Sequence, residues 1–126
     1  MSSRYEMEKL WRREKYGVMF HSQTHYIQVR NVLKTKCTIE DVTRLIDDAK
    51  QIEPTKGSVL NTYQHMWGYF KKYATEDEKA AYKQNTLYFE RDEVRADVLL
   101  RLILSLAKKY EVDYLLNSSL LISLDE

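Results

Sequence analysis

The chain has 126 residues, 44% of them hydrophobic and 31% charged, and this length and composition suit a single domain with its own core. Three glycines and one proline are too few for the many turns of a β-sandwich or a β-barrel. One cysteine excludes an intrachain disulfide framework and a multi-cysteine metal site. The same cysteine count and the charged N-terminus predict a cytoplasmic protein, and no apolar run is long enough to span a membrane.

The first third of the chain predicts three helices, each opened by a hydroxyl side chain. The first helix covers residues 3–20, with Ser2 or Ser3 as its cap. After a short break, Ser22 is expected to cap a second helix. Thr38 opens a third helix, and the acids that follow it suit the positive end of the helix dipole.

The stretch from Pro54 to Tyr73 predicts a fourth helix that begins near Ser58, with an apolar side and a polar side. A glycine inside a helix costs about 1 kcal/mol relative to alanine. The sequence therefore predicts that another backbone crosses closely at Gly68 or that a ligand binds there. The apolar side comprises Val59, Tyr63, Met66, Phe70 and Tyr73, and the polar side comprises Asn61, Gln64, His65, Gly68, Lys71 and Lys72.

The remaining third predicts three more helices. The spacing after Thr75 is that of a capping box, and the helix it opens is expected to end near Phe89. Asp92 is expected to cap a sixth helix over 93–110, and a last short helix covers 113–121. The sixth helix is apolar over a broad face, which predicts either a central place in the core or a homodimer through it.

These elements predict an all-α protein, a compact bundle of six to seven helices forming one domain over residues 1–126. The net charge of +1 is unevenly spread. Residues 1–37 and 54–73 together carry +8, and the other segments carry −7. If the two basic segments lie side by side, the molecule has a positive face. The alternative is that surface charges of both signs balance in three dimensions.

Two motifs resemble the YbgA-like domain family, a bacterial family of unknown function. The first runs from Lys15 to Gln23 and is followed by Tyr26. The second has Asn61, then His65, then residues 68–71. The resemblance extends more weakly to about residue 121, and the chain departs from the family pattern in its C-terminal half, at residues 89–92 and at Ser105. The motif positions expected to serve the fold are Tyr16, Gly17, Ser22, Tyr26 and Phe70.

The resemblance implies a role beside sulfur-removing enzymes. Domains of this family occur alone or attached to a thiouracil-desulfidase-like domain, which removes sulfur from thiolated uracil or thiouridine with an iron–sulfur cluster. A domain in that setting is expected to help bind RNA, notably tRNA. One cysteine cannot hold such a cluster. The resemblance therefore implies an RNA-binding accessory module that carries no cofactor, has no catalytic residues of its own and works with a separate desulfidase.

The residues agree with that expectation by their chemistry. Lysines can contact phosphates, aromatic rings can stack on an unpaired base, and amide or imidazole groups can bond to a base edge. The predicted site is a basic groove between the first and fourth helices. Its expected residues are Lys15, His21, Asn61, His65, Gly68, Tyr69, Lys71 and Lys72, with Tyr16 and Trp67 as further stacking candidates.

Other interpretations of the same residues stay open. Tyr69 and Trp67 can belong to the core, and the polar residues can form a buried network that ties the first helix to the fourth. The alternative function is a small-molecule or nucleotide-binding protein, or an uncharacterised enzyme, with a pocket around His21, Asn61 and His65. A zinc site of three histidines is disfavoured, because the motif that would supply it is absent.

Overall fold

The computed structural model describes residues 4–125, so the predicted cap at Ser2 or Ser3 lies outside the described residues. The described part of the chain contains six long α-helices, two one-turn helices and a 3₁₀ turn, with no strand. The prediction of an all-α bundle is thus confirmed. The elements are α1 (Arg4–His21), α2 (Gln23–Val32), α3 (Ile39–Lys50), α4 (Lys56–Trp67), α5 (Glu76–Glu90), α6 (Ala96–Lys109), α7 (Asp113–Leu116), α8 (Ser119–Ile122) and η1 (Ser123–Asp125).

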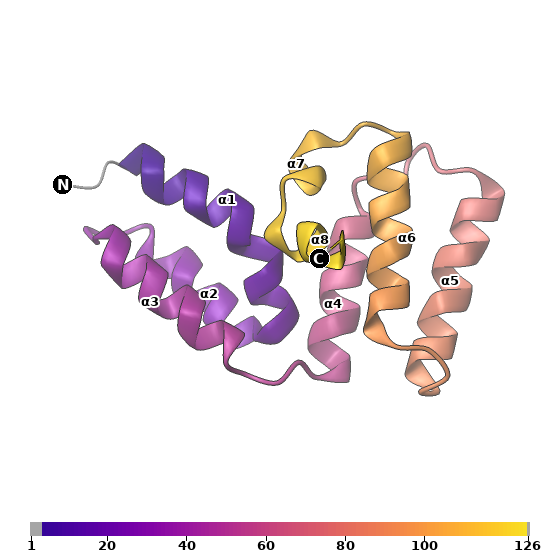
Figure 1. Ribbon diagram of the computed structural model, residues 1–126, viewed down its shortest axis with the longest axis horizontal. Coiled ribbons are helices and arrows are strands. Elements are labelled where there is room, and N and C mark those ends of the chain that lie inside the picture. Colours follow the sequence, from indigo (N-terminus) through magenta and orange to yellow (C-terminus); the bar gives the residue numbers. More distant parts are fainter. Residues whose placement is uncertain (1–3, 126) are drawn as a thin grey trace.

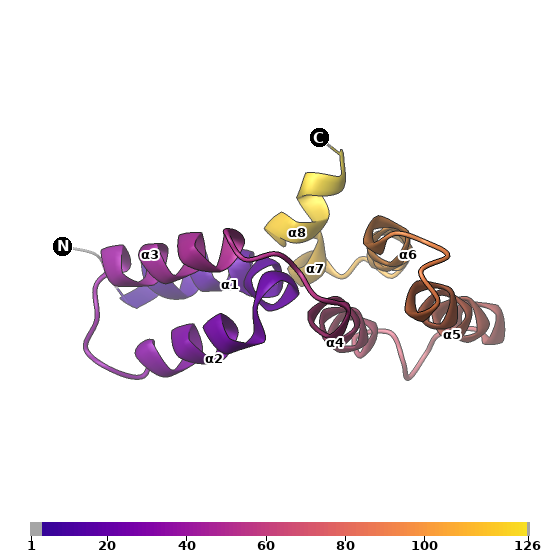
Figure 2. The same cartoon turned by 90° about the horizontal axis from the view of Figure 1, so that it is seen from below.

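The helices form two groups along the long axis of the molecule (Figure 1). Helices α1, α2 and α3 pack on one another in the first group, and α6 contacts both α4 and α5 in the second. Helix α1 joins the groups by contacting α4 and α8, and the short α7 and α8 lie between the groups in both views (Figure 2).

Four helices begin at hydroxyl caps, three of them at the expected residues. Ser22 Oγ accepts a hydrogen bond from the His25 amide at 3.1 Å, and Thr38 and Thr75 form capping boxes at the starts of α3 and α5. The fourth cap is Thr55, which forms a capping box with Ser58. Helix α4 therefore starts earlier than the sequence predicted, because Ser58 lies inside its first turn.

The ends of the later helices differ from expectation. Helix α4 ends at Trp67 and turns follow, so Tyr73 is 52% exposed and does not belong to the core stripe. Asp92 has a φ of 60°, a left-handed conformation that cannot serve as an N-cap, and α6 begins after Arg95. The single last helix predicted over 113–121 is divided into α7 and α8.

The core is built mainly from one face each of α1, α4 and α6, and its largest fully buried side chains include Met19, Tyr63, Met66, Phe70, Leu99 and Ile103. Helix α5 differs from the other long helices of the described chain because it has no fully buried residue. Its outer side stays open to solvent, and its contact with α4 leaves a groove. None of the described helices is both long and apolar enough to cross a membrane.

Candidate functional site

The α4/α5 groove consists of two neighbouring hollows that share Gln64, Tyr82 and Lys83. One hollow, of about 730 Å³, is lined by Gln64, His65, Trp67, Gly68, Lys71, Lys79, Tyr82 and Lys83. The other, of about 480 Å³, is lined by Leu60, Tyr63, Gln64, Tyr82, Lys83, Thr86 and Leu87. Most of the residues that line the first hollow are polar or cationic, and most of those that line the second are apolar or aromatic.

Stacked aromatic rings hold the two walls of the groove together. Tyr63 and Trp67 lie one turn apart on α4 and so share a face of that helix. Tyr82 of α5 stacks on both, with ring centroids 4.7 Å from Tyr63 and 4.4 Å from Trp67. Burial raises the pKa of the Tyr82 hydroxyl. Trp67 is 6% exposed, so it serves the core and is not available to stack on a base.

Two of the three lysines that line the groove have no acidic partner among the described residues. Lys71 and Lys83 are exposed and, within residues 4–125, neither makes an ion pair. Lys79 pairs only with exposed Glu76 at 3.5 Å, and a surface pair of this kind contributes little. No Asp or Glu of the described chain lines either hollow. The groove therefore presents uncompensated positive charge.

Gly68 caps α4 with a φ of −53°, so no special backbone conformation requires a glycine there. A Cβ at this position would lie 3.1 Å from the His65 carbonyl oxygen, an atom of its own helix. No other segment of the described chain comes within 4 Å of that Cβ position. The expected close crossing of a second backbone at Gly68 is therefore wrong. Its side of the helix faces the first hollow instead.

His21 and Asn61 lie together at a different place, in a hollow of about 540 Å³. The Nδ1 atom of His21 donates to the Ile52 carbonyl at 2.8 Å, and the Asn61 amide donates to Gln23 Oε1 at 2.7 Å. His65 lines the α4/α5 groove and not this hollow. The structure thus brings His21 together with Asn61 but separates both from His65. No lysine or arginine of the described chain lines the hollow of His21 and Asn61.

The polar contacts in this region connect α1 and α2 to α4. Besides the Asn61–Gln23 bond, the Ser58 hydroxyl donates to the Phe20 carbonyl at 2.7 Å. The hydroxyls of Tyr16 and Tyr69 lie 3.0 Å apart. The Asn61–Gln23 bond is exposed and the other two contacts are partly buried, so they join the helices without forming a fully buried network.

Lys15 and Tyr69 belong to an aromatic cluster that is separate from the groove. Tyr69 is half-buried and stacks on Tyr114, with ring centroids 5.9 Å apart. Lys15 Nζ lies 5.4 Å from the centre of the Tyr16 ring and 5.9 Å from that of Tyr114. Burial is the largest cause that raises the pKa of the Tyr16 hydroxyl. Lys72 is exposed and lines neither hollow of the groove.

The motif residues assigned to the fold are buried. Phe70 is fully buried, Tyr26 packs against Trp11 with ring centroids 5.6 Å apart, and Ser22 caps α2. Gly17 lies inside α1 where α8 approaches, and a Cβ there would lie 3.5 Å from Ser119 Oγ.

The sequence analysis missed every groove residue of α5, namely Lys79, Tyr82, Lys83, Thr86 and Leu87. Lys79 and Lys83 are one turn apart with Tyr82 beside them, which places all three on one face of a helix. That spacing was visible in the sequence. What it could not indicate is that this face of α5 lies beside His65 and Lys71.

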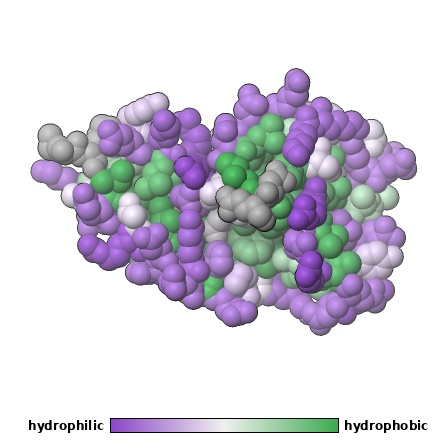
Figure 3. All heavy atoms as spheres, viewed as in Figure 1, coloured by the Kyte–Doolittle hydropathy of each residue, from purple (hydrophilic) through white to green (hydrophobic). Residues whose placement is uncertain are grey.

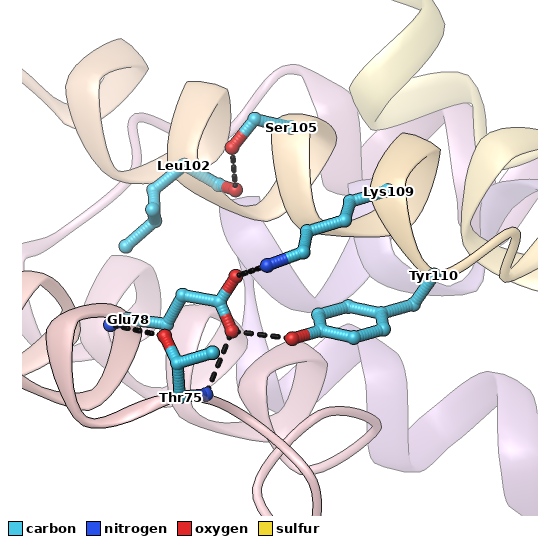
Figure 4. Close-up of polar contacts among 6 residues, drawn as sticks. All are labelled: Thr75, Glu78, Leu102, Ser105, Lys109 and Tyr110. Atoms are coloured by element: carbon cyan, nitrogen blue, oxygen red, sulfur yellow. Dashed lines mark hydrogen bonds and ion pairs between the residues drawn. The ribbon is translucent and has the colours of Figure 1, made fainter.

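A cluster around Glu78 fixes α5 to α6 (Figure 4). The Glu78 carboxylate accepts hydrogen bonds from Lys109 Nζ at 2.6 Å, from the Tyr110 hydroxyl at 2.5 Å and from the Thr75 amide at 2.9 Å. These donors, above all Lys109, lower the pKa of Glu78 from 4.5 to about 2. Helix α5, which carries Lys79 and Lys83, is thus joined through its first turn to the end of α6.

The described residues hold no group of three or more His, Cys, Asp or Glu side chains arranged for a metal ion. The fold and the groove together define a small all-α domain with a cationic groove between two helices. The chain belongs to the DUF1722 family, described as a protein of unknown function, whose family model matches residues 15–123. Searches of curated proteins and of solved structures returned no match to the chain.

Proposed function

We propose that this protein binds RNA through the α4/α5 groove, with Lys71 and Lys83 on the phosphates. One observation carries the proposal: Lys71 and Lys83, exposed and without acidic partners, meet on a groove that no carboxylate of the described residues lines. Lysines that neutralise phosphates release counterions, and this release drives most of the sequence-independent affinity for nucleic acids. The sequence led us to expect a groove between the first and fourth helices, but the unpaired cations that favour RNA line the α4/α5 groove.

The resemblance to the YbgA-like domain family supports tRNA as the RNA and a separate desulfidase as the partner. In this proposal the chain holds the RNA, and the partner carries out the removal of sulfur from thiolated uridine. The chain itself supplies no catalytic residue and no cofactor.

Fluorescence anisotropy with labelled tRNA tests the proposal. We expect affinity to fall steeply with added salt, and each phosphate contact to contribute about 0.7–0.9 to the slope of log affinity against log salt. The Lys71→Gln/Lys83→Gln double variant should therefore lower the slope by about 1.5. Lys34→Gln is the matched control, because Lys34 is also exposed but lies in the other group of helices, beyond the end of α2.

Circular dichroism should show that both variants keep the wild-type fold, since all three lysines are exposed. Absence of binding, or binding that does not respond to salt, would refute RNA binding. An equal loss in the Lys34→Gln control would refute the assignment to the groove.

The homodimer through 93–110 stays a prediction. On the face seen in Figure 3, apolar atoms gather around α8 and between α5 and α6, whereas the rim is hydrophilic. Val98 of α6 is 37% exposed, which leaves an apolar side chain available to a second copy. Light scattering would test this prediction, and a strict monomer at high concentration would contradict it.

A further inference from the structure

We infer that the α4/α5 groove seats an unpaired nucleotide, with its base in the apolar hollow and its phosphate on the lysines of the cationic hollow. This inference rests on the proposed RNA binding and goes beyond it, because charge alone does not distinguish an unpaired strand from a duplex.

The apolar hollow has the size and lining of a site for a flat ring. Its volume of about 480 Å³ lies within the range of small-molecule sites. Its wall includes Leu87, whose apolar side chain is 50% exposed and is therefore accessible to a ligand. Tyr82 is half-buried and reaches both hollows, so the two share an aromatic wall.

The apolar hollow and the cationic hollow lie side by side, as the base and the phosphate of a nucleotide require. Gln64 and Lys83 line both, so a base in one hollow has cationic groups immediately beside it in the other. Lys71 lies at the cationic end and supplies a second contact for the same strand. A nucleotide needs this combination of an apolar surface for the base and a positive charge for its phosphate.

Gln64 supplies the group that distinguishes a base from an apolar side chain. It is exposed, and its carboxamide makes no hydrogen bond within the described part of the chain. A free carboxamide both donates and accepts, so it can pair with the edge of an unpaired base. In a duplex these edges are occupied and the faces of the base are stacked. A duplex would therefore contact only the lysines.

The experiment compares two RNAs with the same number of phosphates, a hairpin with an unpaired loop and a blunt duplex, by fluorescence anisotropy at one salt concentration. The wild-type protein should bind the hairpin at least about fivefold more tightly, because only an unpaired base can bury its apolar face in the hollow. Leu87→Ser and Gln64→Ala should each reduce this preference several-fold and leave duplex binding unchanged. Ile27→Ser is the matched control, because Ile27 is a 43% exposed apolar residue of α2 that lies outside the groove.

The possible results distinguish a failure of the base site from a failure of RNA binding itself. Equal affinity for hairpin and duplex overturns the inference and leaves RNA binding by the groove in place. A preference for the hairpin that survives both Leu87→Ser and Gln64→Ala also overturns it, because the base then binds elsewhere. Absence of binding to either RNA overturns the proposed function and the inference with it.

Discussion

Replacing Gly17 with alanine should stabilise the protein, although this glycine belongs to one of the two motifs. Gly17 is a buried residue inside α1, and a Cβ there would lie 3.5 Å from Ser119 Oγ. That separation is an ordinary van der Waals contact, so the methyl group fits without movement of α8. Alanine is favoured over glycine in a helix interior by about 1 kcal/mol, partly because it restricts the unfolded chain.

For a domain of this size, about 1 kcal/mol corresponds to an increase in Tm of about 4 °C. Thermal and urea unfolding followed by circular dichroism measure the change. Gly17→Leu should instead lower the free energy of unfolding by about 1–3 kcal/mol, because atoms beyond Cβ would meet α8. A clear decrease in Tm for Gly17→Ala would refute the reasoning. It would mean that Ser119 Oγ lies closer than 3.5 Å to the position of the added Cβ atom.

Two further predictions concern buried or partly buried carboxylates. The pKa of Glu78 is lowered to about 2, so its contribution to stability is present above the unfolded value of 4.5 and is lost as the pH falls towards 2. Glu78→Gln should be less stable than the wild type at pH 7 and show a flatter decline in urea midpoint below pH 4.5. Glu14 is 6% exposed and pairs with the more exposed Lys50. Lys50→Ala should therefore lower the free energy of unfolding in urea by about 1–3 kcal/mol more than Glu14→Gln does. Only Lys50→Ala leaves the buried carboxylate of Glu14 without its main partner. An equal cost for the two variants would contradict this asymmetry.

The sequence was most informative where structure depends on neighbouring residues alone. Ser22, Thr38 and Thr75 were identified as caps because a hydroxyl at the start of a helix satisfies amides only two or three positions away. Thr55 uses the same chemistry but was not identified as a cap, since the fourth helix was expected to begin near Ser58. Asp92 was misassigned because its left-handed φ cannot be read from its residue type.

The candidate site was only partly predictable, because it depends on which helices become neighbours. His65, Gly68 and Lys71 are spaced three residues apart within the helix expected from the sequence, so their shared position could be predicted. Lys83 of α5 joins them only through the packing of α5 against α4, which the stacking of Tyr82 produces. Such long-range packing has no signature within a short window of sequence.

The lack of fully buried residues on α5 has a consequence for how the groove can work. Segments with little buried apolar surface open locally at a lower free energy than the core. Since α5 has no fully buried residue whereas α4 has six, the amide hydrogens of α5 should exchange with solvent sooner than those of α4. We therefore expect the α5 flank of the groove to yield more readily than the α4 flank, which would let the proposed RNA site adjust its width.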